Sequence, residues 1–124
     1  MKIETHVINN TRIAEVISDE IIINTPEDAL DILGDLYYQN FDKIILYERN
    51  ITSNFFDLKK GMAGEILQKF SNYRVGLAII GDFSKYKNKS LNDFIYESNK
   101  SEHTIFAESK AEAIGILSAK QKLG

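Results

Sequence analysis

The sequence predicts one α/β domain over residues 1–124, with a mixed, mostly parallel five-stranded sheet and about four helices. Three observations predict this class. Two alternating segments near the N-terminus are typical of a β-hairpin, three later segments are apolar and β-rich, and helical patterns with capping residues follow each of the later strands. The predicted order is therefore β-β-α-β-α-β-α-β-α, and the chain is long enough to bury a sizeable core.

The first two strands are predicted at residues 2–8 and 11–17, where polar and apolar side chains alternate. An Asn-Asn pair separates them, and asparagine tolerates the positive φ angles of a two-residue turn. Such a turn places Glu4 directly opposite Glu15. Two like charges at opposed positions disfavour this register unless the pair is solvated.

Four helices are predicted from apolar spacing and capping residues. The first follows a Thr-Pro pair at residues 25–26, which suits a helix start. The longest is expected over residues 55–72, with its apolar side chains on one stripe. Capping-box patterns predict the last two, near residues 91–99 after Ser90 and near residues 110–120 after Ser109.

Three more strands are expected at residues 43–48, 75–80 and 103–107. Helices separate them, and strand–helix–strand crossovers are right-handed in almost every known protein. The last four strands are therefore expected to run parallel, and the first antiparallel. Residues 44–47 and 75–80 are nearly unbroken apolar runs, typical of strands covered on both faces. Either helices or a partner subunit could supply the second cover.

Composition and charge exclude several classes of function. A net charge of −3 and a pI of about 5.4 argue against a broad nucleic-acid-binding surface. The chain has no cysteine, which excludes disulfides and thiolate chemistry. The N-terminal segment lacks the apolar core of a signal peptide, and no apolar run approaches the ~18 residues of a membrane span. We therefore expect a cytoplasmic protein that binds neither nucleic acid nor membranes.

Polar side chains follow the third and fourth predicted strands, at the edge where open α/β sheets usually bind ligands or partners. They are Glu48, Arg49, Asn50, Asp82 and Ser84. If the two strands are neighbours, Glu48 and Asp82 converge at one rim, where paired carboxylates could divide acid and base roles. Glu48, Asp82 and Ser84 are then candidate catalytic residues. In the structural alternative Asp82 forms a turn or a cap, and Glu48 pairs with Arg49 or Arg74.

A lysine-rich loop, residues 85–89, leads from this rim to Ser90, the predicted cap of the next helix. Free N–H groups at a helix start, with Lys85 nearby, suit an anion such as phosphate, although any solvated loop can carry such lysines. Thr52 and Ser53 directly precede the long predicted helix. Each is a candidate cap and also a candidate phosphoacceptor, because a helix N-terminus stabilises a phosphate.

Gly61 and Gly64 are expected inside the long helix, where each costs about 1 kcal/mol relative to alanine. We expect an offsetting close approach to the sheet or to a partner, so this helix is also a candidate interaction surface. No glycine-rich nucleotide-binding motif is present. His6 and His103 are far apart in the sequence and lack ligand-spaced acids or cysteines, so we predict no metal site and no cofactor.

Four segments of the chain resemble a small bacterial family catalogued only as a domain of unknown function, family 4180. They are DEIIIN (19–24), KIILYERN (43–50), FFDLKKGMAGEILQKFSNYRV (55–75) and GDFSKYKNKSLNDFIYESNK (81–100). The resemblance covers nearly the whole chain. It implies a bacterial, cytosolic, single-domain protein, and it implies no activity.

The order of elements is also similar, more remotely, to the STAS-type or anti-sigma-factor-antagonist fold. This similarity implies a binding module, which some members switch by phosphorylation at the place held here by residues 52–54. The usual Asp-Ser-Ser/Thr-Gly signature of that fold is absent, and Asn-Ile-Thr-Ser-Asn at residues 50–54 replaces it. The similarity is therefore one of topology.

The function predicted from the sequence is a non-catalytic regulatory or protein-interaction module that acts with a protein partner or as a homodimer. Its predicted surface combines residues 48–54 and 82–90 with the first half of the glycine-containing helix. The alternative is a small enzyme or anionic-ligand-binding protein that uses Glu48, Asp82 and Ser84. In that case Arg49 or Lys85 would orient an anionic group.

Overall fold

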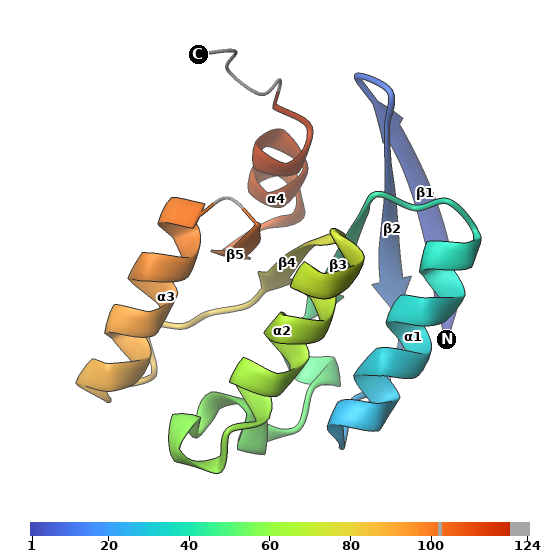
Figure 1. Ribbon diagram of the computed structural model, residues 1–124. Coiled ribbons are helices and arrows are strands. Elements are labelled where there is room, and N and C mark those ends of the chain that lie inside the picture. Colours follow the sequence, from blue (N-terminus) through green and yellow to red (C-terminus); the bar gives the residue numbers. More distant parts are fainter. Residues whose placement is uncertain (102, 120–124) are drawn as a thin grey trace.

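The computed structural model describes residues 1–101 and 103–119, which form five strands and four α-helices (Figure 1). In chain order these are β1 (Lys2–Ile8), β2 (Thr11–Ile17), α1 (Pro26–Tyr38), β3 (Lys43–Tyr47), α2 (Met62–Tyr73), β4 (Gly76–Ile80), α3 (Lys89–Ser101), β5 (Thr104–Ala107) and α4 (Lys110–Leu117). Three 3₁₀ turns lie between β3 and α2, at Glu48–Asn50, Ser53–Phe56 and Leu58–Lys60. The predicted fold class and order of elements are confirmed.

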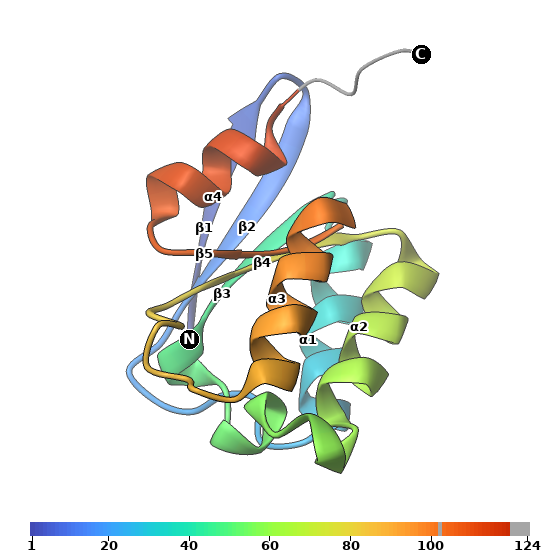
Figure 2. The ribbon, with the colours of Figure 1, turned by 90° about the vertical axis from the view of Figure 1, so that its left-hand side faces the viewer.

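The strands lie in the sheet in the same order as in the chain. β1 and β2 are antiparallel, and β2 to β5 are parallel. Because each right-handed crossover then steps in the same direction, α1, α2 and α3 fall on one face of the sheet. Figure 2 shows these three helices on one side and α4 on the other. Helices of this chain therefore cover both faces of the parallel strands.

Alternate side chains of each strand pack into two hydrophobic cores. The larger core lies beneath α1, α2 and α3, and its strand residues include Ala14, Ile44, Leu46, Leu77, Ile79 and Phe106. The smaller core lies beneath α4 and consists of Ile13, Ile45, Ala78, Ile80, Ile105, Ala107, Ala113 and Leu117. Within the described residues, no helix is long and apolar enough to cross a bilayer.

The predicted hairpin is confirmed, and it adopts the register that the opposed glutamates were expected to disfavour unless solvated, although Glu15 is buried. Asn9 and Asn10 form the turn at φ angles of 53° and 64°, and Glu4 lies opposite Glu15. The side-chain amide of Asn9 donates a hydrogen bond to the Ser118 carbonyl at 2.9 Å. This bond ties the tip of the hairpin to the C-terminal end of α4.

Two of the predicted helix caps are confirmed and one is wrong. Thr25 and Asp28 form a full capping box at the start of α1, and the Ser109 hydroxyl accepts from the Glu112 N–H at the start of α4. At α3, however, the Asn88 side chain accepts from the Leu91 N–H at 3.1 Å. Ser90 therefore lies inside the first turn of α3 and does not cap it.

Helix α2 begins later than predicted. The side chains of Thr52 and Asp57 cap two short 3₁₀ turns, and the α-helix starts only at Met62. Gly61 has a φ of 76°, a left-handed conformation that favours glycine and interrupts a helix. Phe55 is 2% exposed. The apolar pattern thus correctly indicated a buried segment but not its local conformation.

Replacing Asn88 by alanine is expected to lower the free energy of unfolding by about 1 kcal/mol, because the Leu91 N–H loses its acceptor. Replacing Ser90 by alanine should change it by less than about 0.5 kcal/mol, since Ser90 is exposed and is not the cap. Urea unfolding followed by circular dichroism measures both values. A larger loss for Ser90→Ala than for Asn88→Ala would contradict the cap assignment.

Candidate functional site

The predicted rim lies at the C-terminal ends of β3 and β4. These strands are parallel neighbours in which Tyr47 pairs with Ile80, so Glu48 and Gly81 leave the sheet side by side. The N-terminal ends of α1, α2 and α3 meet the same edge, because each helix follows a parallel strand. This is the edge at which α/β proteins bind ligands and partners.

Glu48 is held firmly at this rim. Its Oε2 accepts hydrogen bonds from the Tyr86 hydroxyl at 2.5 Å and from Lys85 Nζ at 2.8 Å, and its side chain is 12% exposed. Burial, followed by the hydrogen bond and the charge of Glu48, raises the pKa of Tyr86. Tyr86 therefore acts as a hydrogen-bond donor and not as a base. The predicted pairing of Glu48 with an arginine was wrong, because the loop after β4 brings Lys85 to it instead.

Asp82 forms a turn, as the structural alternative predicted. Its Oδ1 accepts hydrogen bonds from the Ser84 hydroxyl at 2.5 Å and from the Ser84 N–H at 3.1 Å. These two bonds lower the pKa of Asp82, with a smaller contribution from Lys85. Asp82 lines a small depression of about 200 Å³ with Gly81 and Glu108. Glu48 lines a different one, so the two carboxylates leave neighbouring strands without facing a common cavity.

Asn50 was predicted as a rim residue, but the structure buries it. It is 1% exposed, and its side-chain amide donates to the carbonyls of Ser18 and Glu20, both at 2.8 Å. The backbone carbonyl of Asn50 accepts hydrogen bonds from the backbone N–H groups of Ile22 and Ile23. Asn50 therefore fastens residues 18–23 to the rim and is not available to a ligand.

The main depression of the rim measures about 360 Å³ and is shallow. Its lining residues are Ile21, Glu48, Arg49, Ile51, Thr52, Ser53, Phe56, Lys85 and Tyr86. Phe56 and Tyr86 stack with ring centroids 5.2 Å apart and provide an aromatic floor. Sequence reasoning missed Ile21, which is 50% exposed although it lies in an isoleucine run. The hydrogen bonds of Asn50 and the bridge between Ile23 and Ile51 hold the segment in which Ile21 faces outward.

The two rim loops carry positive charge in an acidic protein. Residues 48–60 and 82–89 contain six lysines and arginines against three acidic residues, whereas the whole chain has a net charge of −3. Arg49 is exposed and its guanidinium lies 4.4 Å above the ring of Tyr47. Lys87 is also exposed. The depression therefore has two cationic lining residues, Arg49 and Lys85, beside an apolar floor, and its bordering segments carry more positive than negative charge.

The candidate phosphoacceptors do not stand at a helix N-terminus. The Thr52 hydroxyl accepts from the Asn54 N–H and caps a 3₁₀ turn, and α2 starts ten residues later. Ser53 is exposed at the edge of the depression. The expected stabilisation of a phosphate by the dipole of a long helix does not apply here, because a single 3₁₀ turn has almost no macrodipole.

The two glycines of the predicted long helix make no close contact. Gly61 precedes α2 and is required for its left-handed backbone. A Cβ at Gly64 would meet no atom within 4 Å, so the predicted close approach to the sheet is wrong. The close approach occurs instead at Gly81, where a Cβ would lie 2.5 Å from Oε1 and 2.7 Å from Cβ of Glu48.

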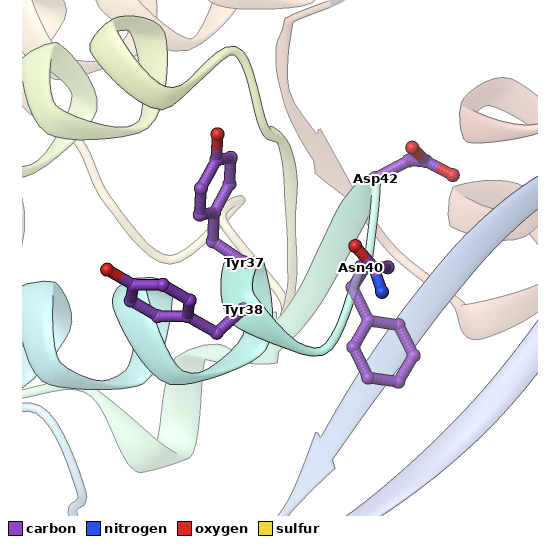
Figure 3. Close-up of a pocket in the computed structure, with 5 residues that line it drawn as sticks. Tyr37, Tyr38, Asn40 and Asp42 are labelled. Atoms are coloured by element: carbon purple, nitrogen blue, oxygen red, sulfur yellow. The ribbon is translucent and has the colours of Figure 1, made fainter.

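Another shallow depression, of about 310 Å³, surrounds the turn between α1 and β3 (Figure 3). Figure 3 shows the rings of Tyr37 and Tyr38 on one side of the turn and the side chains of Asn40 and Asp42 on the other. The Asp42 carboxylate accepts the Arg12 N–H at 2.8 Å. The polar groups do not converge on one point, so we assign no ligand to this surface.

A polar cluster that the sequence did not predict lies beside α4. Glu15 is 2% exposed, and its Oε1 lies 2.9 Å from His6 Nε2 and 3.4 Å from Lys110 Nζ. Its Oε2 accepts from the Tyr47 hydroxyl at 2.6 Å. Burial alone would raise the pKa of Glu15, but the bonds from Tyr47 and His6 and the charge of Lys110 outweigh burial and lower it. Burial and Glu15 raise the pKa of Tyr47 to about 12.

Acidic residues do accompany His6, contrary to the prediction. Glu4, His6 and Glu15 each place a potential ligand atom within 4.8 Å of the others. The prediction failed because it considered spacing along the chain and not the pairing across the hairpin. Glu15 already has three partners, and we therefore assign the cluster the structural role of compensating a buried carboxylate.

The structure is a small α/β domain with shallow depressions at the polar edge of its sheet. The family model described as "Domain of unknown function (DUF4180)" matches residues 8–117, and the chain belongs to this family. The predicted membership is confirmed. No curated protein and no solved structure matches the chain. The similarity to the STAS-type fold thus rests on the order of elements alone.

Replacing Gly81 by alanine is expected to lower the free energy of unfolding by about 1–3 kcal/mol, because the new Cβ would overlap Glu48. The matched substitution Gly64→Ala should raise it by about 0.5–1 kcal/mol, since the site is open and alanine is the better helix former. Urea titrations compare the two variants with the wild type. Stabilisation by Gly81→Ala would show that Glu48 does not occupy this position.

Replacing Glu15 by glutamine tests the buried carboxylate. Because folding lowers the pKa of Glu15, its charged form stabilises the folded state above the ordinary glutamate pKa, and this contribution is lost as the pH falls through the lowered pKa. Near neutral pH, the free energy of unfolding of the wild type should be about 1–3 kcal/mol larger than that of Glu15→Gln. The difference should shrink below about pH 4. Urea unfolding at several pH values measures it, and a pH-independent difference would contradict the assignment.

Proposed function

We propose that this protein is a non-catalytic, cytoplasmic regulatory module whose rim binds an acidic segment of a protein partner. The observation that carries the proposal is the cationic edge above an apolar floor in the depression between Glu48 and Ser53. In an acidic chain, Arg49 and Lys85 line this depression, and the segments that border it, residues 48–60 and 82–89, carry four more lysines. Charge complementarity of this kind selects partners and accelerates their association.

The shape of the rim supports binding to a protein surface. The depression has about 360 Å³, enough for one or two side chains, and Ile21 projects beside it with half of its surface exposed. Contiguous apolar surface rimmed by polar residues is typical of interaction sites, and Ile21, Ile51 and Phe56 supply the apolar part of this lining. An apolar side chain next to an acidic one in the partner would contact Ile21 and Phe56 while its carboxylate meets Arg49.

The state of the polar groups favours binding over catalysis. The carboxylate of Glu48 is occupied by Tyr86 and Lys85, and that of Asp82 by Ser84. A general base needs access to the proton it removes. The alternative is an enzyme or a small-anion-binding protein that uses Glu48, Asp82 and Ser84. Its ligand would lie at the same rim, so an experiment must distinguish the two functions.

A photo-crosslinking residue at position 53, which is exposed at the edge of the depression, tests the proposal in the native host. Position 68, exposed on α2, is the control. We expect one protein to be crosslinked at position 53 and not at position 68. If no protein is crosslinked at position 53 while purified chain binds phosphate or a carboxylate metabolite there, the small-anion alternative holds and the proposal fails.

Charge reversal at the rim should weaken binding of the crosslinked partner, once that partner has been purified. Arg49→Glu with Lys87→Glu is expected to raise the dissociation constant by about tenfold or more, because two exposed cations that face the partner are reversed. The control, Arg74→Glu with Lys100→Glu, makes the same change in net charge at exposed residues near the opposite edge of the sheet. It should leave the dissociation constant within about twofold of the wild-type value. Calorimetric titration measures both. Equal losses would place the binding surface elsewhere.

A further inference from the structure

The sheet has two edge strands, β1 and β5, and the fold treats them differently. β5 has only four residues, and an asparagine of α3 closes its outer edge. Asn99 Oδ1 accepts from the Phe106 N–H at 2.7 Å, and the Asn99 side-chain amide donates to the Phe106 carbonyl at 3.4 Å. A side chain thus takes the place of a neighbouring strand, one of the devices that prevent edge pairing.

β1 has seven residues, and its outer edge is open. In a hairpin with a two-residue turn, Ile8 and Thr11 exchange hydrogen bonds, so the even-numbered residues of β1 bond to β2. The N–H and C=O groups of Ile3, Thr5 and Val7 therefore point away from the sheet. In the described part of the chain, no other element hydrogen-bonds to them. Val7 is also 60% exposed.

We infer that β1 pairs antiparallel with β1 of a second copy, which joins two five-stranded sheets into one continuous sheet. In an antiparallel pair related by a twofold axis, the numbers of any two opposed residues add up to the same value. The outward N–H and C=O groups belong to odd-numbered residues, so they can hydrogen-bond across the axis only if odd-numbered residues lie opposite each other. Full overlap of Lys2–Ile8 with itself satisfies both conditions. Thr5 then lies opposite Thr5 of the second copy, and Ile3 opposite Val7.

Charge selects this register over its neighbours. Full overlap places Glu4 opposite His6 of the second copy, at a non-hydrogen-bonded position where side chains approach most closely. A shift of the register by two residues would place either Glu4 opposite Glu4 or His6 opposite His6. Within its own chain Glu4 faces Glu15, with Lys2 as its ion-pair partner at 3.2 Å. The imidazole of His6 uses only Nε2 for Glu15, so its second nitrogen can face Glu4 of the other copy.

The apolar residues of β1 agree with the same register. Val7 and Ile3 lie on the face of the sheet that carries α1, and Ile3 packs against the larger core. Pairing places the exposed Val7 of one copy against Ile3 of the other, on both sides of the axis. The interface uses the side of the sheet and not the rim, so the inference stands independently of the proposed partner.

The absence of cysteine allows a direct test of the register. Opposed residues in a hydrogen-bonded antiparallel pair have Cα atoms about 5.5 Å apart, within the range of a disulfide. Thr5→Cys, on the twofold axis, should form a covalent dimer under mild oxidation. Val7→Cys alone should not, but a mixture of Ile3→Cys and Val7→Cys chains should crosslink. Crosslinking of Val7→Cys with itself and not of Thr5→Cys would overturn the register.

Sedimentation of the full chain across a series of concentrations tests the dimer itself. We expect a mass of twice 14.1 kDa. Thr5→Pro removes an outward N–H that β2 does not use, and should weaken the dimer about tenfold or more while the circular dichroism spectrum is kept. A monomer at all concentrations overturns the inference, as does a dimer in which Thr5→Cys fails to crosslink. If Thr5→Pro does not fold, the cysteine series decides, and it is unaffected by whether the rim crosslinks a partner.

Discussion

Right-handed crossovers in a sheet that keeps its strands in chain order are the constraint on which the rest of this structure depends. Each of the three crossovers moves one strand further in the same direction, so α1, α2 and α3 are placed on a single face. The opposite face of the apolar strands must then be covered by the segment after β5. Helix α4, with eight residues, is that cover. The rim, the buried carboxylate and the open edge strand all result from this arrangement.

The short cover explains the polar chemistry beside α4. The helix packs over β4 and β5 and reaches the hairpin through its ends, with Lys110 at Glu15 and Ser118 at Asn9. Between these ends Glu15 is buried without a full apolar layer, and His6, Tyr47 and Lys110 compensate its charge. A buried carboxylate without such partners would cost several kcal/mol. The like-charge pair across the hairpin is tolerated because the two carboxylates have different partners. Glu15 is compensated by His6, Tyr47 and Lys110, and Glu4 forms an ion pair with Lys2.

Much of the fold was predictable, because its signals are local. Alternation identified β1 and β2, unbroken apolar runs identified β3 and β4, and the capping residues of α1 and α4 lie three residues before the N–H groups that donate to them. The errors came where two local signals competed. Asn88 and Ser90 are both capping residues, and the apolar stripe from Phe55 onward fits a helix until Gly61 takes a left-handed backbone. At the rim, the positions of Glu48 and Asp82 after neighbouring strands and the turn formed by Asp82 agree with the prediction, but the partners of Glu48 and the burial of Asn50 were not predicted.

The sequence by itself determined the type and order of the elements, the parallel sheet with its polar edge, and membership of the family, because periodicity, caps and handedness act over a few residues or through general rules. Only the tertiary structure decided which side chains meet. Tyr86 reaches Glu48 across 38 positions and Asn50 holds residues 18–20 across about 30. It also decided that Asn99 closes one edge of the sheet while β1 remains open. Such contacts depend on how loops return in space, and no local pattern in the chain encodes that return.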